Sequence, residues 1–184
     1  MLAEKSSAKL FLSEQPYAVQ GFTLIELMIT ISIAAILLAV GVPSMRDMIQ
    51  QNRLTGNVNE FVAANMLARS EAIKRGSAVT LCRAVNAESG SDACAAAGDW
   101  NTGWLAGVGP SNAVTEVLAR QKALPTGTTV TATIPAITYG GMGQPTSSKE
   151  DSFTFANDCK LEGRKVVISR SGHASVEKTA AAGC

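Results

Sequence analysis

The residue with the clearest chemical potential is Glu26, a carboxylate in an otherwise uncharged and mostly apolar run from Phe22 to Val42. About 20 such residues, at about 1.5 Å of helical rise each, span a hydrocarbon core of about 30 Å. A carboxylate costs about 2.5–3.5 kcal/mol at the centre of such a run and less near an end, so its natural partner is a cation. A cut between Gly21 and Phe22 would create an α-amino group four residues before Glu26. The amine of a neighbouring copy could then neutralise this carboxylate.

The segment from Gly21 to Glu26 reads Gly-Phe-Thr-Leu-Ile-Glu. It resembles the class III leader-peptide site of type IV prepilins and of the pseudopilins of type II secretion systems. The resemblance implies that Gly21 ends the leader, that Phe22 is the N-methylated first mature residue, and that Glu26 pairs with an adjacent subunit during assembly. It also implies a prepilin peptidase and other major and minor pilins or pseudopilins as partners. The alternative is an ordinary N-terminal anchor with an incidental glutamate.

Residues 1–21 are predicted to be a prepilin leader that is absent from the mature protein. Lys5 and Lys9 are balanced by Glu4 and Glu14, and the segment has no apolar stretch of its own. It therefore differs from an ordinary secretory signal peptide. Leaders of the resembled family are usually shorter and clearly basic, and a start codon further downstream is one explanation of this difference.

One long helix is expected after the leader, with a transmembrane part at residues 22–42 and an amphipathic part at residues 43–75. Pro43 removes a helical hydrogen bond and predicts a kink near Gly41–Pro43. Beyond it, apolar residues recur at helical spacing. The helix is expected to end at Lys74-Arg75-Gly76, because cations in the last turn and a following glycine are typical of helix ends.

The end of this helix carries a second resemblance. Residues 65–76 read Asn-Met-Leu-Ala-Arg-Ser-Glu-Ala-Ile-Lys-Arg-Gly and are similar to the FimT/GspH branch of the family. This similarity narrows the expectation to a minor pilin or a pseudopilin.

Residues 76–184 are predicted to form a globular β domain. Strand candidates follow one another at short intervals between glycine- and proline-containing turns, which favours two small packed antiparallel sheets. The candidates are residues 78–82, 99–108, 116–124, 128–134, 152–156, 164–170 and 174–177, the last two as a hairpin. The expected fold class is α+β, with a long N-terminal transmembrane helix packed on this β domain as in type IV pilins.

Trp100 and Trp104 occur in a Trp-x-x-Gly-Trp pattern that looks like a strand of the same family. Two tryptophans could form a stacking platform for nucleic-acid bases. The stronger expectation is structural, with Trp104 in the core against the helix and Trp100 near a strand end.

The four cysteines are Cys82, Cys94, Cys159 and Cys184. An even number in an exported domain favours two disulfides, and four cysteines allow three connectivities. Proximity in the sequence favours Cys82–Cys94 and Cys159–Cys184, with free buried thiols as the alternative. No two of them form a Cys-x-x-Cys pair and the chain has one histidine, so a zinc site is not expected.

Enzymatic chemistry is not expected. His173 is the only histidine, and the chain has no Gly-x-Ser-x-Gly, His-Glu-x-x-His or Walker A pattern. Its glycine pairs read as turns rather than as a dinucleotide loop, so no cofactor is predicted. The net charge of +1 gives no general indication of nucleic-acid or acidic partners.

A local basic region near the C-terminus is the exception. It contains Lys160, Arg164, Lys165, Arg170, His173 and Lys178. Strand alternation predicts Arg164, Val166, Ile168 and Arg170 on one face and Lys165, Val167 and Ser169 on the other.

Some FimT-like minor pilins bind DNA through a basic C-terminal Gly-Arg-x-Arg element. The nearest matches here are Gly163-Arg164-Lys165 and Gly172-His173-Ala174, and at the second the arginines are replaced by His173 and Ser175. Two readings therefore stay open, a site for double-stranded DNA and a solvated strand edge whose charges prevent edge pairing.

These observations predict a FimT-like minor pilin. It would be held in the inner membrane by a single helix, with its globular domain in the periplasm, and be incorporated at or near a pilus tip. The alternative is a GspH-like minor pseudopilin of a type II secretion system with the same anchor.

Overall fold

The computed structural model describes residues 21–85, 93–157 and 162–180. The predicted leader up to residue 20, and both Cys159 and Cys184, lie outside these ranges. Within them, one long helix, α1 (Leu24–Arg75), precedes a set of short strands. The chain divides into two compact units between Val42 and Pro43. The kink expected near Pro43 stays a prediction.

The first unit is the apolar part of α1, and every described residue in it is exposed. The chain itself therefore buries none of these side chains. Within the second unit, α1 is amphipathic and buries one face. The buried residues recur at intervals of three or four, as helical geometry requires for a single face. The apolar ones are Leu54, Val58, Phe61, Ala64, Ala68 and Ala72.

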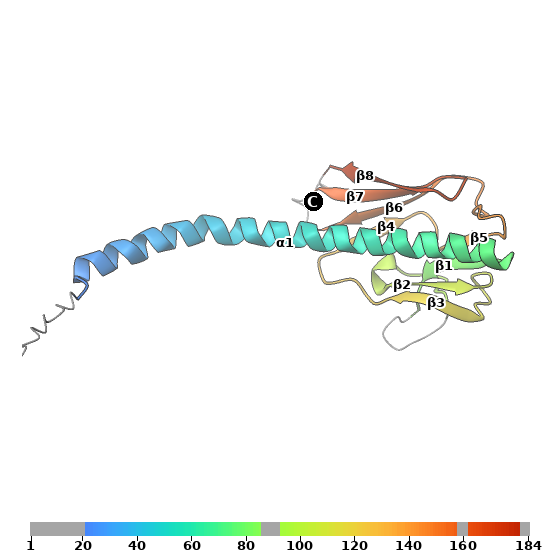
Figure 1. Cartoon of the computed structure of the whole chain (residues 1–184), viewed down its shortest axis with the longest axis horizontal. Helices are drawn as coiled ribbons and strands as arrows, with labels where there is room; N and C mark the ends of the chain where they lie inside the picture. The colour runs from blue at the N-terminus through green and yellow to red at the C-terminus, as the bar shows by residue number, and fades with distance from the viewer. Residues whose placement is uncertain (1–20, 86–92, 158–161, 181–184) are drawn as a thin grey trace, which may run out of the picture. The chain divides into compact units, whose positions relative to one another are not determined.

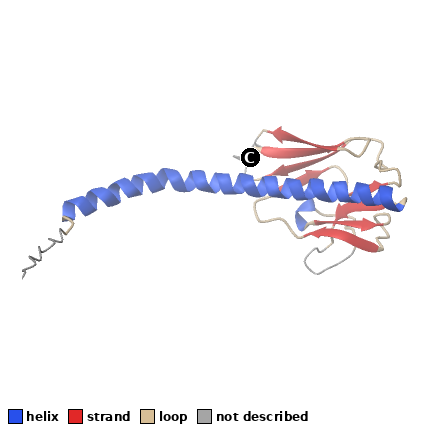
Figure 2. Cartoon of the chain, viewed as in Figure 1, coloured by secondary structure: helices blue, strands red, loops and turns tan. Residues whose placement is uncertain are grey.

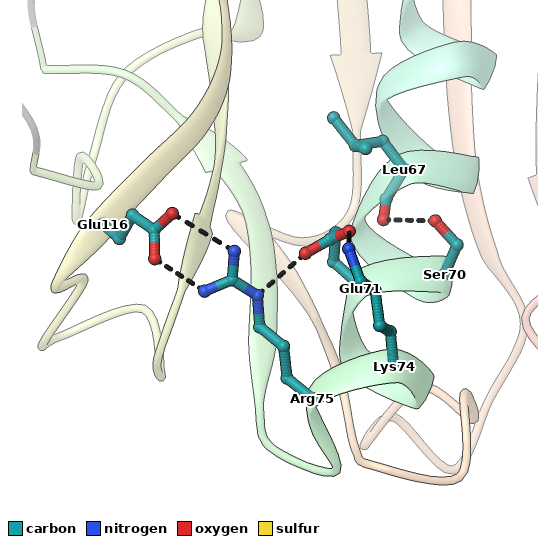
Figure 3. A network of polar contacts seen from close by, with 6 residues as sticks. All are labelled: Leu67, Ser70, Glu71, Lys74, Arg75 and Glu116. Carbon is teal, nitrogen blue, oxygen red and sulfur yellow. Dashed lines mark hydrogen bonds and ion pairs between the residues drawn. The ribbon is translucent and has the colours of Figure 1, made fainter.

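The helix ends where the sequence predicts. Lys74 and Arg75 lie in its last turn, and Gly76 follows with a φ of +62°, in the left-handed region that favours glycine. The side chain of Arg75 bonds to Glu71 on the helix and to Glu116 on a strand (Figure 3). The end of α1 is thereby fixed to the β domain.

Two four-stranded antiparallel sheets pack with α1 (Figures 1 and 2). The first has the order β3-β2-β1-β5, and the second has the order β4-β6-β7-β8. The first sheet consists of β1 (Val79–Arg83), β2 (Trp104–Val108), β3 (Glu116–Gln121) and β5 (Ala136–Tyr139). The second consists of β4 (Thr129–Ala132), β6 (Asp151–Ala156), β7 (Gly163–Ile168) and β8 (Ala174–Thr179). The predicted fold class is confirmed.

Phe61 of α1 lies at the centre of the core and contacts four aromatic rings. Its ring centroid is 5.4 Å from Trp104 and 5.7 Å from Trp100, both in edge arrangements. It is 4.6 Å from Phe153 and 5.4 Å from Phe155, which alternate with half-buried residues along β6. One helical residue therefore joins the helix to both sheets. The structural expectation for Trp104 is confirmed.

The segment 99–108 is not the single strand that the sequence predicts. It consists of a short 3-10 helix, η1 (Trp100–Thr102), followed by β2. Trp100 is 2% exposed, and its Nε1 donates a hydrogen bond to the Ile134 carbonyl over 3.0 Å. Trp100 lies four residues before the start of β2, and this bond and the contact with Phe61 hold it in the core.

The strand β5 is absent from the sequence-based expectation. It has four residues, and alternate ones, Ile137 and Tyr139, are buried. It pairs with β1 from Val79 to Cys82 and completes the first sheet.

Candidate processing and assembly site

The bond between Gly21 and Phe22 lies before the first helical turn. Residues 21–23 have no regular secondary structure, and α1 begins at Leu24. Phe22 is 83% exposed. The predicted cleavage point therefore lies outside the helix.

Thr23 caps the start of the helix. The backbone N–H of Glu26 donates to Thr23 Oγ1 over 3.2 Å, and the N–H of Leu27 donates to the Thr23 carbonyl over 3.2 Å. Thr23-x-x-Glu26 matches the Ser/Thr-x-x-Glu pattern of a capping box. This pattern was readable in the sequence, but the sequence-based interpretation used only the charge of Glu26.

Glu26 lies in the first turn of α1, where a carboxylate interacts favourably with the positive end of the helix dipole. Its side chain is exposed, and it forms no ion pair with any residue that the structure describes. The carboxylate is therefore available to a cation from outside the subunit.

The helix that follows is long and apolar enough to cross a membrane, with a mean hydropathy of 2.5 in its most apolar window. The two hydroxyl side chains of its apolar part, up to Val42, are satisfied locally, because Thr30 Oγ1 donates to the Leu27 carbonyl over 2.8 Å and Ser32 Oγ to the Met28 carbonyl over 2.7 Å. Such bonds let hydroxyl groups enter an apolar environment. The surface suits lipid or other apolar helices.

The second unit contains a disulfide between Cys82 on β1 and Cys94, as the sequence predicts. Arg83 reinforces the same region, since its guanidinium donates to the carbonyls of Gly98 and Ala96. The predicted Cys159–Cys184 pair lies outside the described residues and stays a prediction.

The basic C-terminal residues that the structure describes do not form one patch, and Lys160 lies outside the described residues. Arg164 and Lys178 lie directly opposite each other on β7 and β8. Glu162 lies 4.0 Å from Arg164 and 3.6 Å from Lys178, so one carboxylate partly neutralises both cations. Lys165 projects to the other face of the sheet and lies opposite Glu177.

Arg170 is not at the end of a strand, contrary to the prediction. β7 ends at Ile168, and Arg170 is exposed in the turn that leads to β8. The turn closes because Ser169 and His173 exchange hydrogen bonds, among them Ser169 N to the His173 carbonyl at 2.9 Å. The predicted hairpin of β7 and β8 is confirmed, but its charges are divided between two faces and a turn.

No group of three or more histidine, cysteine, aspartate or glutamate side chains that could hold a metal is found among the described residues. His173 is exposed and serves the turn through its backbone.

Comparisons with known proteins decide the family. A family model described as type II transport protein GspH matches residues 57–172, more than half of the chain. The chain belongs to the GspH family. A second model, for the prokaryotic N-terminal methylation motif, matches residues 17–42 of this GspH-family chain. That range includes Gly21, Phe22 and Glu26, and the motif implies processing by a prepilin peptidase and assembly with other pilins.

Two crystal structures of the type IV minor pilin FimU from Pseudomonas aeruginosa (strain PAO1) are similar to this chain. One has a TM-score of 0.57 and 22% identity, covering 71% of this chain and 92% of FimU. The other has a TM-score of 0.54 and 22% identity, covering 67% and 92%. This likeness shows a shared fold. A comparison with curated proteins gives no match.

This GspH-family chain is thus a minor pilin or pseudopilin, of a type IV pilus or of a type II secretion system. Proteins of these families are structural rather than enzymatic. The single apolar helix near the N-terminus is consistent with a membrane-anchored component.

Proposed function

We propose that this chain is a FimT-like minor pilin that is incorporated into a type IV pilus at or near its tip. The observation that carries the proposal is the start of α1, where a capped Glu26 without an ion pair among the described residues heads an exposed apolar segment up to Val42. The fold shared with a type IV minor pilin supports the pilus assignment. A GspH-like minor pseudopilin of a type II secretion system is the second candidate, and the family match supports it equally.

Cleavage of the leader would change the charge on the Phe22 nitrogen, and this change would link processing to assembly. Before cleavage, the nitrogen of Phe22 belongs to a peptide bond and carries no charge. Cleavage after Gly21 creates a cationic amine, which N-methylation at Phe22 would retain. In an apolar surrounding, Glu26 of one subunit needs such a cation, and the processed Phe22 of an adjacent subunit supplies it.

We place the globular unit in the periplasm and the apolar helix in the inner membrane before assembly. The Cys82–Cys94 disulfide supports this placement, because such bonds persist in oxidising compartments and are rare in the cytosol. The domain limits follow, with a leader at 1–21, a transmembrane part at 22–42, an amphipathic part at 43–75 and a globular domain at 76–184.

The test compares Glu26→Gln with Glu60→Gln, which removes the same charge from another exposed helical position. We expect both variants to lose their leader normally, as measured by mass spectrometry. We expect Glu26→Gln alone to be depleted from sheared filaments on immunoblots. Normal incorporation of Glu26→Gln would contradict the charge-pairing role. Performing the assay in strains that lack either the pilus or the secretion system separates the two candidates.

DNA binding is a further part of the proposal, with Arg164, Lys165, Arg170, His173 and Lys178 as the candidate residues. Arg170 is expected to contribute most, because Glu162 lies beside Arg164 and Lys178, and Glu177 lies opposite Lys165. A fragment from Pro43 onward can be used, since every buried residue of the described chain lies at Leu54 or beyond.

Titration with double-stranded DNA at low and moderate salt tests this part. We expect salt-sensitive binding that is lost when Arg164, Lys165 and Arg170 are all replaced by alanine. The control replaces Lys74, Lys122 and Lys149, which removes equal charge elsewhere. Absence of binding at low salt, or equal loss in the control, would reject a DNA site in this hairpin.

A further inference from the structure

A cavity of about 340 Å³ lies in the second unit, where α1 passes the turn that precedes β4. Its lining is about half polar and half apolar and comes from three separate segments of the chain. The lining residues are Gln50, Arg53, Pro125, Thr126, Gly127, Thr128 and Asn157. None of these described residues is acidic.

The walls of this cavity are held by hydrogen bonds. Asn157 Nδ2 donates to the Gln50 carbonyl over 2.7 Å, and Thr128 Oγ1 donates to Asn157 Oδ1 over 2.9 Å. The turn closes through a bond of 3.1 Å from the Thr128 N–H to the Pro125 carbonyl. Gly127 has a φ of +90° and faces open space, so the turn leaves the cavity accessible. The cavity is therefore a formed feature of the fold.

Arg53 is the only cation that lines the cavity among the described residues. It is exposed and forms no hydrogen bond or ion pair with any residue in the described ranges. The backbone N–H groups of Thr126 and Gly127 likewise have no acceptor there. A guanidinium, these backbone N–H groups and the Thr126 hydroxyl are donors that suit a phosphate or carboxylate oxygen.

A second cation extends this face of the helix. Arg46 precedes Arg53 by seven residues, close to two helical turns, so both lie on one face of α1. Two acids on the same helix must be considered. Asp47 is about 120° away from Arg53 around the axis, and Glu60 is about 10 Å further along it. Glu60 lines a different cavity beside Trp104. Neither carboxylate forms an ion pair with either arginine in the part of the chain that is described.

The length of chain before the cavity indicates where its anion comes from. Val42, the last residue of the apolar unit, precedes Arg53 by eleven residues. Both residues belong to α1, and eleven residues span about 16 Å along a helix. A headgroup layer is about 5–8 Å deep on each side of the hydrocarbon core, helical side chains lean toward the helix N-terminus, and membrane helices are tilted by about 20° on average. Arg53 can therefore reach the phosphates of a membrane that holds the apolar unit.

We propose that this cavity binds the phosphodiester headgroup of an anionic phospholipid, with Arg53 as the principal ligand. The contact holds the globular unit against the membrane before assembly. It must then break when the subunit leaves the membrane for a filament. This inference adds a lipid site to the proposed function and does not depend on the filament to which the subunit belongs.

The test uses the fragment from Pro43 to Cys184, so that the apolar anchor does not mask headgroup affinity. Binding is measured by co-sedimentation with phosphatidylcholine vesicles that contain or lack phosphatidylglycerol. We expect binding to the anionic vesicles and a loss of at least about fivefold in affinity for Arg53→Gln. Lys149→Gln removes the same charge at an exposed position outside the cavity and should bind as the wild type does. Thermal melting of each variant confirms that it is folded.

Three outcomes would overturn the proposal. Equal loss in both variants would indicate general charge attraction. Arg53-dependent binding of inorganic phosphate without binding to vesicles would indicate a small soluble anion. Wild-type vesicle binding by Arg53→Gln, together with its exclusion from filaments, would assign Arg53 to a contact with another subunit.

Discussion

Arg75 on α1 holds both carboxylate oxygens of Glu116 on β3, with Nη1–Oε2 and Nη2–Oε1 distances of 2.6 and 3.2 Å (Figure 3). The same guanidinium donates through Nε to Glu71, 2.8 Å away. This network is the polar connection between the end of the helix and an edge strand of the first sheet. Both carboxyl groups have a pKa below the ordinary value, because Arg75 hydrogen-bonds to their charged forms.

Glu116→Gln should lower the free energy of unfolding near neutral pH. The pKa of Glu116 is depressed in the folded state, so its contribution is present above the ordinary value of 4.5 and is lost as the pH falls through the folded pKa. The difference between variant and wild type should therefore shrink as the pH falls below 4.5. Urea unfolding across this range measures it, and Glu150→Gln is the exposed control. A constant difference would exclude the ion pair as the cause.

Asp151 should show the opposite pH dependence. Its side chain is 3% exposed at the start of β6, and Oδ2 has no hydrogen-bond partner within the described residues. Burial raises the pKa of this carboxyl, so the charged form costs stability that is regained as the pH falls. Asp151→Asn should therefore raise the unfolding free energy near neutral pH, with a gain that disappears in acid. A loss of stability at neutral pH would show that the carboxylate has a structural partner.

The long helix was predictable because its apolar residues keep a helical period and its end carries the usual cations and glycine. The strand β5 was not, because four residues between Pro135 and Gly140 are too few to show a period. The position of Trp100 depends on contacts with Phe61 and Ile134, which are distant in the sequence. Local patterns do not contain such contacts.

The candidate site also has one part that the sequence predicts and one part that it does not. The processing motif at Gly21–Glu26 is local, and a family model recovers it. The basic C-terminal residues depend on strand register, which pairs Arg164 with Lys178 and leaves Arg170 in a turn. Register and turn position are set by the packed sheet, so the sequence could not show how these charges are distributed.

Gly172, in the turn between β7 and β8, should not tolerate alanine. Its φ is +79°, and an added Cβ would lie 2.7 Å from the Gly143 carbonyl oxygen and 3.1 Å from Arg69 Nε. Arg69 Nε already donates to that carbonyl over 3.0 Å, so the space is occupied by a hydrogen bond that fixes the loop after β5 to α1. We expect Gly172→Ala to lower the unfolding free energy by about 2–4 kcal/mol, including about 1–2 kcal/mol of backbone strain.

Gly127→Ala is the matched control for this measurement. Gly127 also has a positive φ, +90°, but nothing lies within 4 Å of its added Cβ. Gly127→Ala should therefore lower the unfolding free energy only by the cost of backbone strain, about 1–2 kcal/mol. Equal losses in chemical denaturation would show that the contact of Gly172 with Gly143 and Arg69 contributes nothing.

The described ends of the second sheet favour a disulfide between Cys159 and Cys184. Phe155 pairs with Arg164, and Gly163 pairs with Thr179, so β6 and β8 both end at the edge where β7 begins. Adjacent strands are about 4.8 Å apart, which puts these two ends about 10 Å from each other. Cys159 follows β6 by three residues and Cys184 follows β8 by five. Both chains are long enough to bring their Cα atoms within the roughly 7 Å that a disulfide requires.

Peptide mapping by mass spectrometry without reduction should therefore find two linked pairs, Cys82–Cys94 and Cys159–Cys184. Replacing Cys159 by alanine should lower the unfolding free energy by about 2–4 kcal/mol, because the bond closes a loop of moderate length. Alkylation of Cys159 and Cys184 in unreduced protein from the periplasm would contradict the second pair. Cys82 and Cys94 serve as the internal control, since their bond should resist alkylation in the same sample. If the second pair forms, the end of β8 is tied to β6 and the basic hairpin is held at both of its ends.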